Sequence, residues 1–331
     1  MKKRLGLMIS GNFPCVRSGK MTHAMNNHGY EHDALCLKSP RQFLESYREI
    51  IHNPLMTKKE MGELIRSHPA EILHIHNEPN WPVIVAKEYA EGRPVVLNVH
   101  DLACARPNEA IDPFEAEAFD AADAFIFVSE QQREYAIRQG LPVGNKPYAV
   151  IANYVSSSML VDEKLLPHIG GIVYAGGTDP RSGGQKWRDY SPLADKLGGQ
   201  LHIYAGNPGT DYGIVHETIV QYPVLMHRLA QHDWGFTGTY RGDIMAHQHS
   251  VPNKIFDYFA AGIPIIAMNV PLAQEYVRLG MGLYAGVLDD VVRVQKIDPR
   301  PYRKAVLEHR ERFTMEARIS AVTDLYHSLG V

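Results

Sequence analysis

The chain has 331 residues, of which 45% are hydrophobic and 21% charged, and its formal net charge at pH 7 is −3. A disordered chain needs low hydrophobicity and a large net charge, and a disulfide scaffold needs many cysteines, so both classes are excluded. The near balance of charges gives no overall attraction to nucleic acid, so we expect no nucleic-acid partner. The length exceeds one hydrophobic core of common size, which predicts two domains.

The cysteine pattern and the first residues indicate the cellular compartment of the protein. Its three cysteines are an odd number with no C-x-x-C pair, which favours a reducing compartment. The apolar run 5–9 is broken by Ser10 and Gly11, well short of the core of a signal peptide. No later stretch approaches the ~18 consecutive apolar residues of a membrane span. We therefore expect a cytoplasmic protein.

In the first half of the chain, short apolar runs of strand length alternate with helical patterns, which predicts a parallel α/β architecture. Strands are expected at 4–9, 33–37, 72–75, 95–99, 124–128 and 148–151. Helices are expected at 19–27, 82–89, 113–119 and 130–139. The rhythm breaks after Asn153 and resumes near residue 170, so we place a domain boundary near residue 155.

The second half repeats this alternation. Strands are expected at 171–175, 201–205, 234–236, 264–268 and 282–284, and helices at 190–197, 221–230, 253–261, 272–279 and within 302–330. The prediction is two doubly wound, Rossmann-like domains, 1–155 and 156–331, that face each other across a cleft at the carboxyl ends of their sheets. The last helix is a candidate to pack back on the first domain. Neither a dinucleotide-binding fingerprint nor a Walker A loop occurs in the sequence.

The segment from Ser250 to Ala267 carries the most specific pattern in the chain. Lys254, Asp257 and Tyr258 follow one another at i, i+3 and i+4, so a helix places them on one face. A helix N-terminus with an added lysine suits a diphosphate, and a carboxylate one turn further can accept ribose hydroxyls. The alternative is a surface Lys–Asp pair, which would contribute only about 0.2–0.5 kcal/mol.

This segment resembles the donor-binding helix of the GT-B fold, nucleotide-sugar-dependent glycosyltransferases. The resemblance covers most of the chain, and it is to the retaining group that includes bacterial polysaccharide and lipopolysaccharide transferases. It implies transfer from a nucleotide sugar, with a UDP-sugar as the expected donor, to a carbohydrate, lipid-linked or protein acceptor. It also implies no cofactor and no bound metal. The donor-binding residues on this helix would be Asn253, Lys254, Asp257 and Tyr258, whereas His249 stands where many members of the group carry an acid.

Two further loops are expected to contact the donor. The glycine-rich loop 176–188 follows the first strand of the second domain, and its backbone N–H groups and cations can approach phosphates. The resemblance implies an arginine and a lysine on the diphosphate, and a solvated loop is the alternative. The candidates in these two loops are Gly177, Arg181, Lys186, Arg188 and, after the next strand, Asn207.

A histidine ends one of the buried strands of the first domain. His100 and Asp101 directly follow the run 95–99, at the edge where open α/β sheets bind ligands. The resemblance implies that His100 hydrogen-bonds the donor sugar near the reacting carbon and that Asp101 orients it or the acceptor. A buried structural histidine is the alternative.

The segment 74–80 offers two histidines on one strand face, at positions 74 and 76. Zinc needs three or four ligands, and no third residue has a diagnostic spacing, so we expect no metal. The resemblance instead assigns this segment, and the loop after the first strand, to the acceptor. The acceptor-side candidates are Gly19, His76, Asn77 and Glu78.

The basic run 293–312 is diluted by acids, so a solvated helix face is favoured over peripheral membrane contact. Two other functions stay open at this point. One is a nucleotide-sugar epimerase or hydrolase of the same fold, and the other is a non-catalytic homologue that binds a nucleotide sugar.

Overall fold

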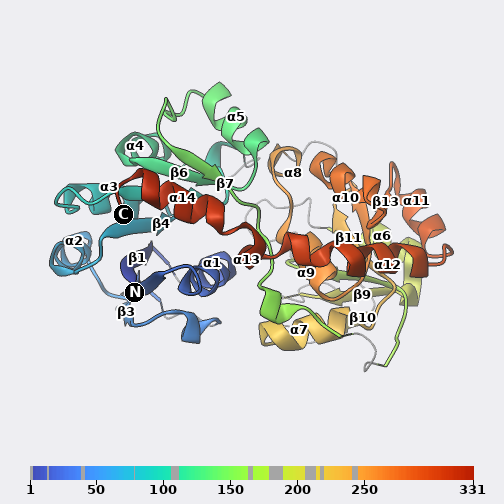
Figure 1. Cartoon of the computed structure of the whole chain (residues 1–331). Coiled ribbons are helices and arrows are strands. Elements are labelled where there is room, and N and C mark those ends of the chain that lie inside the picture. The colour runs from blue at the N-terminus through green and yellow to red at the C-terminus, as the bar shows by residue number, and fades with distance from the viewer. Residues whose placement is uncertain are drawn as a thin grey trace. The chain divides into compact units, whose positions relative to one another are not determined.

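The computed structural model describes residues 3–12, 15–38, 42–77, 79–105, 112–162, 167–178, 189–205, 214–216, 220–240 and 245–331. These residues form two compact units, called unit 1 and unit 2 below (Figure 1). Unit 1 contains the described residues up to 156 together with Met315–Val331, and unit 2 contains those of Ser157–Thr314. No helix within these ranges has the length and apolar character that crossing a bilayer requires.

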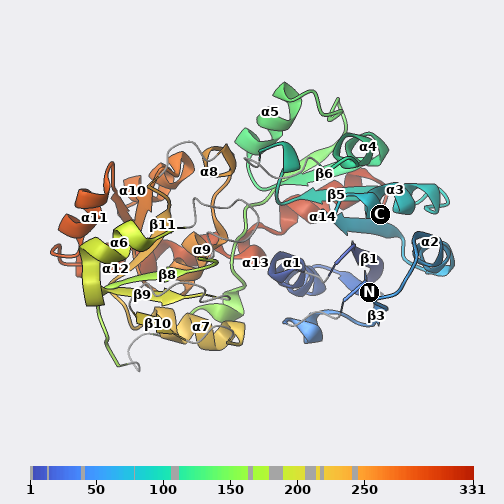
Figure 2. The same ribbon diagram turned by 180° about the vertical axis from the view of Figure 1, so that it is seen from behind.

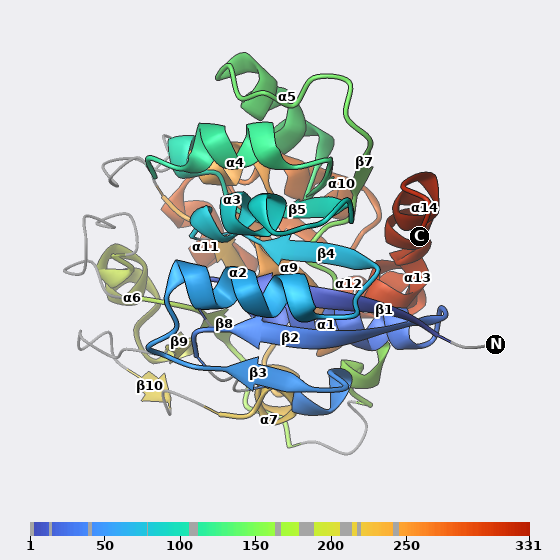
Figure 3. The ribbon, with the colours of Figure 1, turned by 90° about the vertical axis from the view of Figure 1, so that its left-hand side faces the viewer.

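Unit 1 is built on a parallel sheet. Its strands are β1 (Arg4–Ser10), β2 (Tyr30–Cys36), β3 (Ile50–His52), β4 (Ile72–His76), β5 (Val95–Val99), β6 (Ala124–Phe127) and β7 (Tyr148–Val150). The seven strands have the order β3-β2-β1-β4-β5-β6-β7, and the first five follow one another from bottom to top in Figure 3. The order reverses between β1 and β4, which is where such sheets bind ligands at their carboxyl ends.

Helices cover both faces of this sheet. They are α1 (Val16–Asn26), α2 (Lys58–Ser67), α3 (Trp81–Glu88), α4 (Glu115–Ala121), α5 (Glu130–Arg138), α13 (Met315–Arg318) and α14 (Ser320–Ser328). Successive strand residues point to opposite faces, so Leu7 and Ile9 pack with α2 to α5 while Met8 packs with α1 and α14. This alternation produces two separate apolar layers, as a doubly wound unit requires.

The C-terminal segment completes the second apolar layer of unit 1. Met315, Ile319, Val322 and Tyr326 are buried in the same cluster as Ile72 of β4. Figure 1 shows α14, in red, beside the strands of unit 1. The sheet of unit 1 therefore depends on residues from both ends of the chain.

Unit 2 also has a parallel sheet. Its strands are β8 (Ile172–Ala175), β9 (Leu201–Tyr204), β10 (Ile214–His216), β11 (Trp234–Gly238), β12 (Ile265–Met268) and β13 (Gly282–Tyr284). Their order is β10-β9-β8-β11-β12-β13, and Figure 2 shows β8, β9 and β10 as neighbours. The helices are α6 (Ser191–Leu197), α7 (Tyr222–Leu229), α8 (Met245–His249), α9 (Asn253–Ala260), α10 (Gln274–Arg278), α11 (Leu288–Val294) and α12 (Arg300–His309). Here the order reverses between β8 and β11.

Candidate functional site

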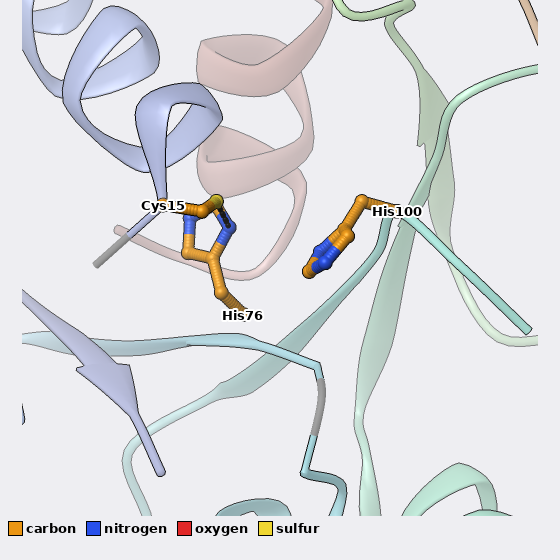
Figure 4. Close-up of side chains that lie close together, drawn as sticks. All are labelled: Cys15, His76 and His100. Carbon is orange, nitrogen blue, oxygen red and sulfur yellow. Dashed lines mark hydrogen bonds between the residues drawn. The ribbon is translucent and has the colours of Figure 1, made fainter. Parts of the chain in front are cut away.

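Three side chains of unit 1 meet near the carboxyl ends of β1, β4 and β5 (Figure 4). His76 is the last residue of β4, and Cys15 directly precedes α1 in the connection that follows β1. His76 pairs in register with Asn98 of β5, so His100, two residues further along, lies on the same face of the sheet. The parallel sheet thus brings together residues that are far apart in the sequence.

The ligand atoms of these three residues all lie within 4.8 Å of one another. The Sγ atom of Cys15 is 3.9 Å from Nδ1 of His76, and the rings of His76 and His100 have centroids 6.4 Å apart. Burial lowers the pKa of His76 well below its ordinary value, so its ring is neutral near pH 7. Burial likewise raises the pKa of the Cys15 thiol.

Asn77 holds the backbone that carries His100. Its Oδ1 accepts a hydrogen bond of 3.1 Å from the His100 N–H, and its Nδ2 donates to the Asp101 carbonyl. Gln132 Nε2 donates to the His100 carbonyl over 3.3 Å. Asn77 was expected to face an acceptor, but its side chain is buried and bonded to this turn. We therefore assign Asn77 a positioning role.

His74, the other histidine of β4, belongs to a buried hydrogen-bond chain. Arg17 Nε donates to Asn98 Oδ1 over 3.0 Å, which turns the Asn98 amide nitrogen toward His74 Nε2, 3.0 Å away. The His74 Nε2 atom therefore accepts, and its Nδ1–H faces the Tyr326 hydroxyl at 2.5 Å. Both ring nitrogens of His74 therefore have hydrogen-bond partners, Tyr326 and Asn98. Of the two β4 histidines that resembled a metal motif, His76 is the one that could bind a metal.

Gly19 does not lie in a loop. The helix α1 begins at Val16, so Gly19 falls in its second turn. A Cβ atom placed on Gly19 would be 2.5 Å from the Cβ of Phe43. The glycine lets α1 approach Phe43, which gives Gly19 a packing role, and its acceptor-side role stays a prediction.

In unit 2, the first turn of α9 lies beside the turn that follows β8. Lys254 Nζ is 4.9 Å from the centroid of the Tyr174 ring, and the Tyr174 hydroxyl donates to the Gly177 carbonyl over 3.1 Å. Gly176 has φ +149°, and a Cβ atom there would be 3.4 Å from Lys254 Cε. Asn253, the first residue of α9, is exposed. Gly177, Asn253 and Lys254 thus lie in one region at the carboxyl end of β8.

Asp257 lies one turn further along α9 and is only 8% exposed. The Tyr222 hydroxyl, from the first residue of α7, donates a hydrogen bond to Asp257 Oδ1. Burial and the Asp257 carboxylate together raise the pKa of Tyr222 well above its ordinary value, so the phenol stays protonated and keeps donating. No local sequence pattern links Tyr222 to Asp257, because the two residues are 35 positions apart.

Tyr258 faces the core of unit 2. It is fully buried, and its hydroxyl accepts from the Ala175 N–H over 3.0 Å and donates to the Phe236 carbonyl over 2.9 Å. This hydroxyl therefore ties α9 to β8 and β11, and its expected role in donor binding is replaced by a structural one. The other predicted site residues, Glu78, Arg181, Lys186, Arg188 and Asn207, lie outside the described residues.

Part of this chain matches a known protein family, and its fold is similar to that of several solved structures. Residues 16–153 match a family model described as a glycosyl transferase 4-like domain. Sucrose-phosphate synthase from Thermosynechococcus elongatus is 15% identical, with a TM-score of 0.69 and 99% of each chain covered. HepE from Anabaena, solved with UDP and glucose, is 13% identical, with a TM-score of 0.70 over 98% of this chain and 100% of that one. A glycosyltransferase from Rickettsia africae is 11% identical, with a TM-score of 0.67 and 99% of each chain covered.

A comparison with curated protein sequences gave no match. The structural likeness shows that the chain has the two-domain α/β fold known as GT-B. The matched domain and this fold together support a glycosyltransferase enzyme.

Proposed function

We propose that the protein transfers a sugar from a UDP-sugar, bound by unit 2, to an acceptor bound by unit 1. The observation that carries this proposal is the position of Lys254, in the first turn of α9 and beside the Gly176–Gly177 turn. A helix N-terminus, backbone N–H groups and a lysine all favour an anion, which suits a diphosphate. HepE has the same fold and has been solved with UDP and with UDP-glucose, which supports this class of donor.

Asp257 is proposed to bind the donor ribose. An ionised carboxylate offers about four lone-pair sites, so it can keep the hydrogen bond from Tyr222 and still accept two ribose hydroxyls. Lys254 and Asp257 are three residues apart on α9, so the diphosphate and the ribose would lie along one face of this helix.

His100 is proposed to hydrogen-bond the donor sugar near the reacting carbon. Its backbone is held on both sides, by Asn77 at the N–H and by Gln132 at the carbonyl, while its ring is only partly buried. These bonds fix the backbone from which the His100 ring extends, and positioning of this kind supports catalysis. Asp101 is proposed to orient His100 or the acceptor.

The finer parts of the proposal rest on the resemblance of the donor helix. They are retention of the anomeric configuration, a carbohydrate, lipid-linked or protein acceptor, and a cytoplasmic role in polysaccharide biosynthesis. The transfer itself is expected to need no metal, because Lys254 and the α9 N-terminus can offset part of the diphosphate charge.

The experiment that tests this function measures UDP release from a nucleotide sugar chosen by thermal shift. A donor at ~100 times its Kd should stabilise the protein by about 2.7 kcal/mol. Release that requires an acceptor supports a transferase, whereas release without one indicates a hydrolase. Isomerised donor without release indicates an epimerase, and binding without any turnover indicates a non-catalytic homologue.

A further inference from the structure

The cluster of Cys15, His76 and His100 in unit 1 has the composition of a transition-metal site (Figure 4). It offers one thiol sulfur and two imidazoles and no carboxylate, a set that suits Zn²⁺ and related ions rather than Mg²⁺ or Ca²⁺. Neither of the other two cysteines belongs to a similar group among the residues that the structure describes.

The distances fit a metal ion of this kind. With Zn–S of about 2.3 Å and Zn–N of about 2.0–2.1 Å, the ligand atoms of a tetrahedral site are roughly 3.3–3.6 Å apart. The Cys15 Sγ to His76 Nδ1 distance is 3.9 Å, and all three ligand atoms lie within 4.8 Å of one another. Contraction by a few tenths of an ångström for one pair, and by at most about 1.5 Å for the others, would therefore reach coordination distance.

His76 is 2% exposed, and its Nδ1 atom is the ring nitrogen that faces the Cys15 thiol. His74 stacks on His76 with ring centroids 5.0 Å apart, but both nitrogens of His74 are already bonded. His76 is therefore the histidine of β4 that can bind an ion together with Cys15 and His100.

We propose that Cys15, His76 and His100 bind one divalent transition-metal ion of the Zn²⁺ class. The Cys15 thiol loses its proton to the buffer as the S–metal bond forms, and the two imidazoles bind through neutral nitrogens. Three protein ligands leave a fourth position for water or another small ligand. The ion neither gains nor loses electrons in this step.

Metal binding has a consequence for the transfer reaction, and this consequence rests on the proposed function. A metal ion bound to His100 occupies one ring nitrogen and fixes the orientation of the ring, so we expect it to compete with the hydrogen bond between His100 and the donor sugar. Zn²⁺ should therefore inhibit turnover, and EDTA should restore it. The affinity for UDP should not change, because Lys254 and Asp257 of unit 2 are not part of the cluster.

The test is a titration of the full chain with Co²⁺, which replaces Zn²⁺ and reports its ligands by absorption. We expect one equivalent to bind, with a thiolate-to-cobalt charge-transfer band in the near ultraviolet that Zn²⁺ abolishes. Cys15→Ser should remove this band, and His100→Ala should weaken binding at least about tenfold. Cys104→Ser is the matched control, because Cys104 is a free cysteine of the same unit, and it should leave the band unchanged.

Absence of the band in the unaltered protein, or the same band in Cys15→Ser, would overturn the site. Thermal unfolding of each variant shows whether it has folded, and Cys15→Ala replaces Cys15→Ser if that variant does not fold. The spectrum is independent of turnover, so an inactive protein that shows the band would refute the proposed function alone. Metal binding without inhibition would leave the site standing and refute the role given to His100.

Discussion

At the scale of single residues, the side chains proposed to act in unit 1 lie at the carboxyl ends of the neighbouring strands β4 and β5. His100→Ala should lower kcat at least tenfold, a loss of about 1.4 kcal/mol of transition-state stabilisation. The Kd for UDP should hardly change, because the nucleotide is assigned to unit 2. Steady-state turnover and nucleotide titration measure the two effects separately. A normal rate combined with weaker UDP binding would contradict the role of His100.

The buried His32 predicts how the stability of unit 1 depends on pH. Burial lowers the pKa of His32 from 6.5 to about 4, and both of its ring nitrogens lack partners among the described residues. Between these two pH values the unfolded chain binds a proton that the folded chain does not, so stability falls as the pH falls from 6.5 toward 4. The loss from this group between pH 7 and pH 5 is about 2 kcal/mol.

Replacing His32 by Phe should remove that part of the pH dependence. Chemical denaturation at pH 7 and at pH 5 measures the free energy of unfolding of each protein. The difference between the two pH values should be smaller by about 2 kcal/mol in the variant. An equal difference in both proteins would mean that His32 is not the titrating group, whatever the absolute stability of the variant.

At the scale of elements, the close approach of α1 to Phe43 depends on one glycine. Gly19→Ala should destabilise the fold by about 1–3 kcal/mol, because the added methyl meets Phe43 Cβ at 2.5 Å. This should happen although alanine is the better helix former by about 1 kcal/mol. Gly199→Ala is the control, since nothing lies within 4 Å of a Cβ there. If both variants unfold at the same denaturant concentration, Phe43 does not prevent a methyl group from being accommodated at residue 19.

The strands of both sheets were largely predictable because parallel strands are buried on both faces. The run 95–99 is apolar apart from Asn98, and β5 covers those residues. The helix α2 was missed because most of its residues are polar and exposed, although Thr57 and Glu60 form a capping box that signals its start. The strand β3 was missed because it has only three residues and none of them is buried, and the three-residue strand β10 was not predicted either.

The candidate sites were predictable only in part. The strand end at His100 and the helix face of Lys254 and Asp257 are each formed by residues close together in the sequence, so both could be predicted from it. Cys15 and His76 are 61 positions apart and meet only because β1 and β4 are neighbours in the sheet. Strand order depends on packing of the whole unit, so no local pattern could reveal this contact.

At the scale of the whole molecule, unit 1 needs the last residues of the chain. Tyr326 is fully buried, with its ring edge on to Tyr30 at 5.2 Å and its hydroxyl on His74. Tyr326→Ala should cost about 3–5 kcal/mol, as for other large aromatic truncations. Hydrogen exchange should then speed up in β1, β4 and β5 more than in β8 and β11. Equal acceleration in both sheets would contradict the assignment of α14 to unit 1.

In the proposed donor site, α9 of unit 2 binds the nucleotide part of a UDP-sugar. Charge-assisted hydrogen bonds contribute roughly 1.5–3 kcal/mol, so Asp257→Asn should weaken UDP binding at least about tenfold. Lys254→Ala should weaken UDP more than uridine, because uridine has no phosphates. Lys196, a lysine of the same unit that pairs with Asp289, provides the control variant Lys196→Ala, which should bind both ligands normally.

Calorimetric titration of these three variants with UDP and with uridine is therefore the most direct test. We expect a large loss of UDP affinity for Asp257→Asn, a loss confined to UDP for Lys254→Ala and no loss for Lys196→Ala. Asp257→Asn protein that binds UDP normally but melts at a lower temperature would make the carboxylate structural. Equal losses of UDP and uridine for Lys254→Ala would place this lysine away from the diphosphate, and either result would contradict the donor site.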